Sequence, residues 1–204
     1  MTPLLGVLLS YLAGSVPSAY LAGKLRGVDL RQHGSGNLGA TNVVRVLGTP
    51  IGAAVFLADL LKGFLPVYFL PMYTETLRPG LWALAYGAAA ILGHVKPIFL
   101  LGKGGGKGVA TASGVFLALA IVPVLITQIV WIAVFYFTRY VSLASLLAAA
   151  SLPIAILAWS RDPSSPIFIA SVVIALFVFW THRANIGRLR RGEEHRFVKK
   201  EHAA

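Results

Sequence analysis

The run Gly108–Thr138, GVATASGVFLALAIVPVLITQIVWIAVFYFT, decides how many times this chain is expected to cross a membrane. Its 31 residues carry no charge. A single helix of that length would be roughly 46 Å long at 1.5 Å per residue, whereas a bilayer core is about 30 Å thick. Pro123 lies in the middle of the run, where a proline breaks or kinks a helix. The run is therefore predicted to form two short spans.

The composition of the whole chain is that of a helical membrane protein. Of its 204 residues, 57% are hydrophobic and only 12% are charged, which is about half the charged fraction of a soluble domain. The first apolar run starts at Pro3 with no basic residue before it, so we interpret it as a span and not as a signal peptide. We expect one membrane domain over residues 1–204, with spans at roughly 3–24, 50–74, 79–95, 108–122, 123–138, 140–160 and 163–182.

The distribution of lysine and arginine supports seven spans over six. Basic residues accumulate in cytoplasmic loops. Seven spans put 15 basic residues on one side and two on the other, whereas six spans divide them 8 to 9. We therefore predict an all-α protein with its N-terminus outside and its C-terminus in the cytosol. The inner side then carries Lys24, Arg26, Arg31, Arg45, Lys96, Lys103, Lys107, Arg139, Arg183, Arg188, Arg190, Arg191, Arg196, Lys199 and Lys200, and the outer side Arg78 and Arg161.

The first polar segment on the predicted cytosolic side is HGSGNLGATN, residues 33–42. Glycines let several backbone N–H groups point at one place and form an anion nest. A helix is expected to start near Thr41 and to add its positive end, and Arg45 one turn later can bind a phosphate with two hydrogen bonds. A flexible loop with a helix cap is the plainer interpretation. The proposed phosphate ligands here are Gly36, Asn37, Gly39, Thr41, Asn42 and Arg45, with Ser35 beside them.

The second segment is GKGGGKGVAT, residues 102–111, which is expected to open the next helix. It lacks the spacing of a Walker A loop, yet bare amides and ammonium groups at a helix N-terminus suit a phosphate. Contact of the lysines with lipid headgroups is the alternative. Its proposed ligands are Gly104, Gly105, Gly106, Lys107, Gly108 and Thr111.

Further polar residues lie beside or within the spans. His182 and Asn185 follow the last span, where they could contact an anion or move a proton, although a basic tail on anionic lipid explains part of that segment. Asp59 and Lys62 are three residues apart on one helix face and could pair; charges inside a membrane suggest function, but a structural brace is equally compatible. His94 ends the third span and could orient the second loop.

Several kinds of chemistry are excluded by what the sequence lacks. There are no cysteines, so disulfides, thiol catalysis and zinc–thiolate sites are impossible. No histidine is followed five residues later by aspartate, and no Gly-x-Ser-x-Gly motif is present. The only adjacent acidic pair is Glu193-Glu194, so we expect no metal site. The net charge of +11 is explained by topology and anionic ligands, and we expect no nucleic-acid partner.

Taken together, the polar segments resemble the PlsY family of bacterial acyl-phosphate:glycerol-3-phosphate acyltransferases. The matches run through nearly the whole chain and in order: GSGNLGATN (34–42) with Arg45; Asp59 with Lys62-Gly63 and Pro66; Gly93-His94 with Pro97; GGKGVAT (105–111); His182-Arg183, Asn185-Ile186, Gly192, Glu194 and Arg196. One departure is visible, because three glycines separate Lys103 from Lys107 where the family usually has two.

The resemblance implies acyl transfer from a fatty acyl phosphate to the 1-hydroxyl of glycerol 3-phosphate, at the cytosolic face of the bacterial cytoplasmic membrane. The products would be lysophosphatidic acid and phosphate, with no cofactor or metal. It implies catalytic roles for Ser35, Lys107, His182 and Asn185, and supporting roles for Asp59, Lys62, His94 and Glu194. Besides the bilayer, an enzyme that makes acyl phosphate from acyl carrier protein is an expected partner. Lys107→Ala should abolish activity and Lys200→Ala should not.

Two other interpretations of the sequence come from different classes of protein. Basic loops at a membrane mouth would also fit a transporter of a phosphorylated metabolite, but transporters usually carry polar groups near the midplane and internal repeats. A purely structural membrane subunit would leave the glycines and paired lysines unexplained.

Overall fold

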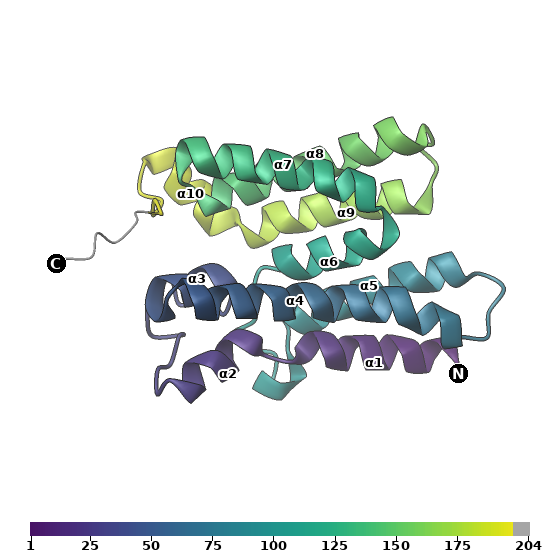
Figure 1. Ribbon diagram of the computed structural model, residues 1–204, viewed down its shortest axis with the longest axis horizontal. Coiled ribbons are helices and arrows are strands. Elements are labelled where there is room, and N and C mark those ends of the chain that lie inside the picture. The colour runs from purple at the N-terminus through teal and green to yellow at the C-terminus, as the bar shows by residue number, and fades with distance from the viewer. Residues whose placement is uncertain (198–204) are drawn as a thin grey trace. The chain divides into compact units, whose positions relative to one another are not determined.

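The computed structural model describes residues 1–197. Lys199, Lys200 and His202, which the sequence places in the cytosolic tail, lie outside the described residues. Every regular element in the described range is a helix, in agreement with the predicted all-α class. Contacts divide the chain into two compact units, Met1–Ile121 and the part that begins at Val122, and Figure 1 shows the helices of each.

The first unit is a set of packed helices joined by two glycine-containing loops. The α5 helix packs against α1, and α4 packs against α6. The elements are α1 (Pro3–Ser15), α2 (Ser18–Leu25), α3 (Ala40–Leu47), α4 (Thr49–Phe69), the 3-10 turn η1 (Leu70–Tyr73), α5 (Pro79–Val95), the 3-10 turn η2 (Ile98–Leu100) and α6 (Val109–Leu119).

As far as residue 197, the second unit contains three long helices and one short one. They are α7 (Ile121–Thr138), α8 (Val141–Ser160), α9 (Pro166–Thr181) and α10 (Arg183–Arg191). The indole of Trp131 donates a hydrogen bond of 3.2 Å to Ser145 and links α7 to α8. At the end of the described chain, the N–H of Phe197 donates to the carbonyl of Arg139, 2.8 Å away. The segment 192–197 therefore leads back to the turn between α7 and α8.

Within residues 1–197, five helical segments are long and apolar enough to cross a membrane. They are Pro3–Leu25, Thr49–Tyr73, Pro79–Leu100, Ile121–Thr138 and Val141–Ser160, and α9 with α10 makes a sixth if that pair, bent by 59°, is counted as one span. The apolar helix α6 has 11 residues, or roughly 16 Å at 1.5 Å per residue. It is shorter than the bilayer core.

The predicted break in the run 108–138 is present, but at Ala120 and not at Pro123. Ala120 leaves helical geometry with φ −154° and ψ 71°. Pro123 lies in the first turn of α7. The N–H groups of a first turn have no acceptor within the helix, so a proline there breaks no hydrogen bond.

The predicted first span, 3–24, is not one continuous helix. It is divided at Val16 and Pro17 into α1 and α2. Pro17 cannot donate a backbone hydrogen bond, so the helix is interrupted there. The carbonyl of Val16 instead accepts a hydrogen bond of 2.9 Å from the ammonium group of Lys62 on α4. The side chain of Lys62, from another helix, thus supplies a hydrogen bond to a carbonyl that the break leaves without a helical partner.

Glycines bring the backbones of paired helices in the first unit into direct contact. A Cβ atom added to Gly14 on α1 would collide with the carbonyl of Ala90 on α5, and one added to Gly93 would collide with the carbonyl of Tyr11 on α1. Gly63 meets the carbonyl of Thr111 in the same way, and Gly114 meets that of Leu60. Small residues at such positions allow the close packing on which helix association in membranes depends.

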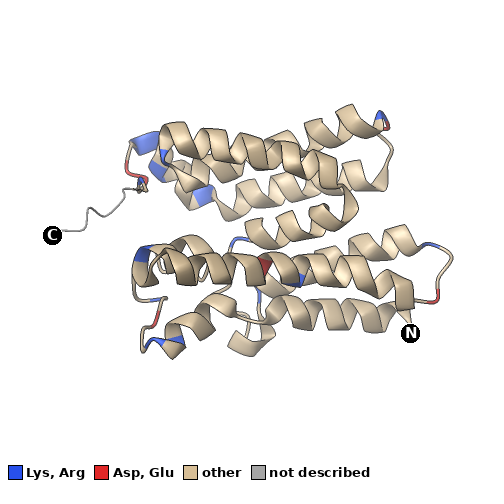
Figure 2. Cartoon of the chain, in the orientation of Figure 1, with Lys and Arg blue, Asp and Glu red and all other residues tan. Residues whose placement is uncertain are grey.

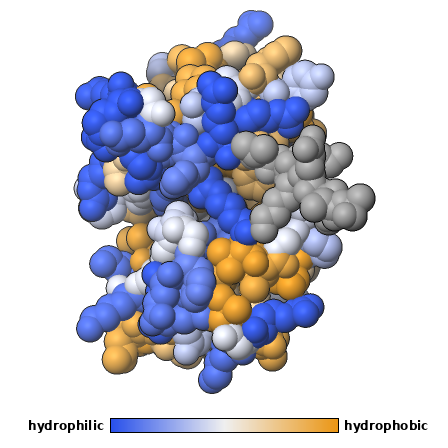
Figure 3. All heavy atoms as spheres, turned by 90° about the vertical axis from the view of Figure 1, so that its left-hand side faces the viewer, coloured by the Kyte–Doolittle hydropathy of each residue, from blue (hydrophilic) through white to orange (hydrophobic). Residues whose placement is uncertain are grey.

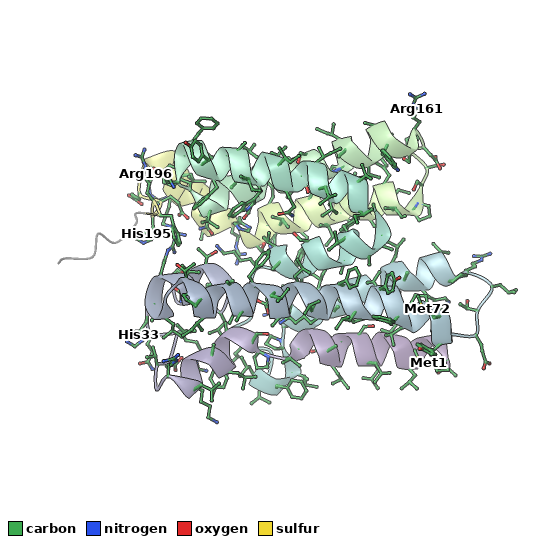
Figure 4. All side chains as sticks on the ribbon, in the orientation of Figure 1. Met1, His33, Met72, Arg161, His195 and Arg196 are labelled. Carbon is green, nitrogen blue, oxygen red and sulfur yellow. The ribbon has the colours of Figure 1, made fainter. Side chains whose placement is uncertain are left out.

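Each unit has a basic end. In the first unit, His33 lies at the opposite end from Met1 and Met72 (Figure 4), and the N-terminal amine donates to the carbonyl of Tyr73, 2.7 Å away. In the second unit, His195 and Arg196 lie at the opposite end from Arg161 (Figure 4). Figure 2 shows most Lys and Arg at the ends of helices and in the loops.

The close contact between α4 and α6 gives a prediction about stability. Gly114→Ala should lower the free energy of unfolding by about 1–3 kcal/mol, because the new methyl group meets backbone that cannot move aside alone. Thermal unfolding in detergent measures the effect. Gly80→Ala is the matched control, since nothing lies within 4 Å of a Cβ added there. Equal unfolding temperatures for the two variants would contradict the proposed packing constraint.

Candidate functional site

The first glycine-containing loop, residues 33–39, is shaped by the side chain of Asn42 on α3. This side chain is buried, with 1% of the residue exposed. Its Oδ1 accepts a hydrogen bond from the N–H of Ser35 at 2.8 Å, and its Nδ2 donates to the carbonyls of Leu30 and His33 at 3.1 and 3.0 Å. Asn42 therefore holds His33 and Ser35 of the loop together with Leu30, which precedes it.

These bonds change the expected arrangement of the loop amides. The N–H of Ser35 is bound to Asn42, and that of Gly36 donates to the carbonyl of His33 at 3.1 Å. Both amides are used inside the loop, so they do not form the open nest that the sequence suggested. The helix that was expected near Thr41 starts at Ala40. Ser35 is exposed, and Arg45 is half-buried in α3 one turn beyond Thr41.

The second glycine-containing loop, residues 102–108, is packed on the end of α5. The N–H of Gly106 donates to the carbonyl of His94 at 3.3 Å. A Cβ on Gly105 would collide with the carbonyl of Val95, and one on Gly106 with the Nε2 of His94. The helix α6 follows at Val109, as expected. Because no side chain fits at either glycine, the loop backbone lies directly on α5.

The predicted ligands of the second loop differ in their exposure. Lys107 is half-buried. Thr111 is fully buried, and its carbonyl faces Gly63 of α4. The position of Thr111 is that of a residue in the packing between α4 and α6. Gly104, Gly105 and Lys107, which are exposed or half-buried, are therefore better placed than Thr111 to meet a ligand, whereas the N–H of Gly106 is bound to His94.

The two loops meet within the first unit. From the Cβ position of Gly104, the Cδ1 of Leu38 is 3.3 Å away and the Cδ of Arg31 is 3.5 Å away. A small pocket lies where they meet, lined by Val16, Pro17, Ser18, Leu38, Asp59, Lys62, His94, Pro97 and Gly104, Gly105 and Gly106. Figure 3 looks onto the end of the first unit at which α2 and α3 lie, where hydrophilic and hydrophobic residues lie side by side.

The floor of the pocket carries the predicted pair of intramembrane charges. The Nζ of Lys62 lies 2.8 Å from the Oδ1 of Asp59, which confirms the pairing that their three-residue spacing predicted. The Nδ1 of His94 lies 3.7 Å from the same oxygen. All three side chains are at least nine-tenths buried. A cluster of charged and titratable groups is thus enclosed between α4, α5 and the second loop.

A second ion pair beside the loops was not anticipated from the sequence. The guanidinium of Arg31 binds the carboxylate of Asp29 through Nε and Nη2, the shorter distance being 2.7 Å, and lies over the ring of Tyr20. The hydrogen bonds from the side chain and backbone of Arg31 lower the pKa of Asp29 to about 2. The two-residue spacing of the pair was the only signal, and many exposed loops share it.

In the second unit, His182 lies at the break between α9 and α10. The residue is 3% exposed, and its Nδ1 is 2.8 Å from the carbonyl of Val178. A carbonyl only accepts hydrogen bonds, so Nδ1 carries the proton in this contact. In the neutral ring Nε2 is then the acceptor. The structure thus fixes the tautomer that a proton-accepting histidine needs at Nε2.

Asn185 is held in place by Glu194. Its Nδ2 donates to Oε1 of Glu194 at 2.6 Å, while Nε of Arg188 donates to Oε2, also at 2.6 Å. Burial raises the pKa of Glu194, but the hydrogen bonds from Asn185 and Arg188 outweigh it and leave this pKa below its ordinary value. A carboxylate accepts only, so the Asn185 amide is oriented with Nδ2 toward Glu194. Arg188 had been assigned no role from the sequence.

No group of three or more His, Asp or Glu residues suited to a metal ion occurs within residues 1–197. The apolar helices, together with the two polar loops that meet beside the pocket, are typical of an integral membrane protein with a polar site.

The comparisons with known proteins agree on one family. The family model for glycerol-3-phosphate acyltransferase matches residues 4–192. The glycerol-3-phosphate acyltransferase of Geobacter metallireducens is 49% identical over 188 residues, covering 92% of this chain and 94% of its own, and that of Aquifex aeolicus is 44% identical over 198 residues, covering 97% and 100%. The chain belongs to the glycerol-3-phosphate acyltransferase family.

Two solved structures are similar over almost the whole chain. Both are crystal structures of PlsY (YgiH), an integral membrane glycerol 3-phosphate acyltransferase. The glycerol 3-phosphate form has a TM-score of 0.88 and 41% identity, covering 96% of each chain. The lysophosphatidic acid form has a TM-score of 0.84 and 40% identity, covering 96% of this chain and 95% of that one. The resemblance stated from the sequence is therefore confirmed for the family, and the all-helical architecture matches that of the integral membrane protein PlsY.

The Glu194 contacts predict a local loss of stability when the carboxylate is removed. Glu194→Ala should lower the free energy of unfolding by about 1–3 kcal/mol, because Asn185 and Arg188 lose a buried acceptor. Glu193→Ala is the control: Glu193 pairs with Arg191 at the exposed surface, where such pairs contribute at most about 1 kcal/mol. Thermal unfolding of both variants is the measurement, and a larger loss for Glu193→Ala would refute the assignment.

The same contacts predict a dependence on pH. The pKa of Glu194 is lower in the folded chain than its ordinary value of 4.5. Its contribution to stability is therefore fully present above pH 4.5 and is lost as the pH falls through the lowered pKa. Unfolding temperatures of the wild type and Glu194→Gln, measured from pH 7 downward, should converge in the acid range. Curves that stay parallel would contradict this role.

Proposed function

We propose that this protein transfers a fatty acyl group from acyl phosphate to the 1-hydroxyl of glycerol 3-phosphate. The products are lysophosphatidic acid and inorganic phosphate, and the reaction opens phospholipid synthesis. Membership of the family carries the proposal, supported by the relatives solved in a glycerol 3-phosphate form and a lysophosphatidic acid form. The meeting of two glycine-containing loops in the first unit is the feature of this chain that suits phosphate-bearing substrates.

We further propose seven spans, with the N-terminus outside, the C-terminus in the cytosol and the glycine-containing loops on the cytosolic side of the bacterial cytoplasmic membrane. The basic end of each unit supports this orientation. The short helix α6 completes the count as the fourth span, followed by α7, α8 and α9. The enzyme that makes acyl phosphate from acyl carrier protein is then a partner on the same side of the membrane.

The reaction is a displacement at the acyl carbon. The 1-hydroxyl oxygen of glycerol 3-phosphate attacks this carbon and forms the ester bond, and the bond between the acyl carbon and the phosphate oxygen breaks. Inorganic phosphate leaves, and the proton of the hydroxyl is taken by a phosphate oxygen or by a side chain. No oxidant, metal or cofactor is needed for this balance. The catalyst must position two anionic groups and stabilise the oxyanion that develops on the acyl carbonyl.

Residues of the first unit suit the binding of these anions. Lys107 and Arg45 are half-buried, so their charges are partly desolvated and act more strongly than surface charges. Ser35 is exposed at the top of its loop and is proposed to place the attacking hydroxyl. Asn37, Gly39 and Thr41 remain proposed ligands. We assign Asn42 and Thr111, which are both buried, to the positioning of the loops around the substrate phosphates.

Residues of the second unit suit the handling of the hydroxyl proton. His182, with its proton on Nδ1, has the tautomer in which Nε2 can accept a proton. Asn185 presents a fixed amide because Glu194 orients it. We propose that His182 accepts the proton or a hydrogen bond from the attacking hydroxyl, and that Asn185 fixes that hydroxyl in a reactive orientation. Glu194 is a positioning residue that acts through Asn185.

The proposed activity is tested with purified protein, acyl phosphate and glycerol 3-phosphate, by following phosphate release and the formation of lysophosphatidic acid. Lys107→Ala should lower kcat/KM at least about 100-fold, because a cation that faces developing negative charge is lost. Lys24→Ala removes the same charge from an exposed position at the end of α2 and should leave the rate nearly unchanged. Equal losses would refute the role of Lys107, and a folded wild type without turnover would refute the activity.

The proposed orientation is tested by labelling, which the absence of cysteine makes straightforward. Single cysteines at Leu77 or Ser164, both exposed in the connections α4–α5 and α8–α9, should react with a membrane-impermeant maleimide added outside intact cells. Cysteines at Gln32 or His195, which are also exposed, should react only after the membrane is opened. The reverse pattern would contradict the orientation, and reaction at all four positions would contradict the spans between them.

A further inference from the structure

The pocket between the two glycine-containing loops has a charged floor that the proposed acyl transfer does not use. Asp59, Lys62 and His94 are held together by distances of 2.8 and 3.7 Å to one carboxylate oxygen. They come from α4 and α5, helices that are otherwise almost entirely apolar. Charged groups are costly at such a place, so their presence calls for a physical reason.

The ion pair is poorly suited to a purely stabilising role. The Oδ1 of Asp59 is close to Lys62 but is not aligned with a hydrogen-bond donor within residues 1–197. A buried pair without well-directed hydrogen bonds barely compensates the loss of hydration of its two charges. Apolar residues of similar size would hold α4 and α5 together as well or better. The cluster is therefore better explained by the backbone segments that it holds in position.

Two members of the cluster contact different backbone segments of the site, and the third joins them. Lys62 donates to the carbonyl of Val16, at the break between α1 and α2 that leads into the first loop. The ring of His94 fills the space beneath Gly106 of the second loop, and the carbonyl of His94 accepts the N–H of Gly106. Asp59 joins the two side chains. The cluster thus connects the helix break to the second loop through three buried side chains.

We propose that Asp59, Lys62 and His94 are positioning residues that set the geometry of the second loop, with His94 acting as the direct support of Gly106. The inference deepens the proposed function, because it assumes that this loop binds a substrate phosphate. The three residues do not touch substrate. They act through the loop backbone, so their loss should weaken the binding of a phosphate-bearing substrate more than it slows the chemical step.

The contact between His94 and Gly106 allows a test by steric compensation. Gly106→Ala should raise the KM for glycerol 3-phosphate or acyl phosphate about tenfold, because the methyl group displaces the loop from its support. Trimming the ring in the same chain, His94→Ala with Gly106→Ala, should restore part of that loss. Neither glycine at 105 nor 106 has a positive φ, so alanine introduces no backbone strain.

The neighbouring glycine provides the matched control. A methyl group at Gly105 collides with the backbone carbonyl of Val95, which trimming His94 does not remove. Gly105→Ala should therefore lose affinity and should not recover when His94→Ala is added. Recovery at Gly106 alone supports the proposal. Equal recovery at both positions, or none at either, overturns the assignment of His94 as the support.

The charged pair is tested by removing both charges at once. Asp59→Asn with Lys62→Met leaves no unpaired buried charge, so the protein should fold, whereas Lys62→Met alone leaves Asp59 unpaired and should be much less stable. In the double variant KM should rise about tenfold while kcat falls less than about threefold. A folded double variant with unchanged KM values overturns the role of the pair. One that does not fold also overturns it, since the pair would then be structural.

Binding measurements separate this proposal from the proposed activity. If the wild type releases no phosphate from acyl phosphate, the acyl transfer fails. The rise in unfolding temperature with glycerol 3-phosphate or inorganic phosphate still reports on the loop. The rise should be smaller in Gly106→Ala and partly restored in its His94→Ala combination. A rise that is the same in all variants, or absent from the wild type with both probes, overturns the positioning role.

Discussion

Direct contact between helix backbones at glycines is the interaction on which the first unit depends. Gly14 and Gly93 let α1 and α5 touch, and Gly63 and Gly114 do the same for α4 and α6. Lipid tails are as apolar as leucine side chains, so helices in a bilayer associate by close packing and not by exclusion from water. The helices α4 and α5 also pack against each other, and there Asp59 meets His94. The packing of the helices in turn determines where the connecting loops lie.

Two breaks in the helices are satisfied by polar side chains. Backbone that leaves helical geometry at membrane depth must find hydrogen-bond partners within the protein. At Val16 the partner comes from Lys62. At the bend between α9 and α10, the imidazole of His182 binds the last turn of α9. In both units, therefore, a side chain that satisfies an interrupted helix also has a proposed role at the site: Lys62 in positioning a loop and His182 in proton transfer.

Much of this arrangement follows from local sequence, and the remainder depends on where side chains point. The third predicted span, 79–95, coincides with α5 because a proline starts the helix and the apolar run ends with it at Val95. The pairing of Asp59 with Lys62 follows from helical spacing. The break at Val16 was missed, since hydropathy averages over Pro17. Asn42 was counted as an open hydrogen-bonding group, whereas it folds back on Leu30, His33 and Ser35. The sequence does not reveal which polar side chains form hydrogen bonds within their own loop. It also does not reveal that Arg188 and Glu194 form a pair.

Packing at glycines also has an evolutionary consequence. The shape of the first unit is specified by a few small residues that face inward, while large side chains such as Leu4, Leu57 and Leu92 are half or more exposed. The outward residues contribute little beyond being apolar. They are free to change with the thickness, fluidity and fatty-acid composition of the host membrane without altering the loops. The lipid-facing surface of the enzyme can thus adapt to a membrane whose lipids are made from the enzyme's own product.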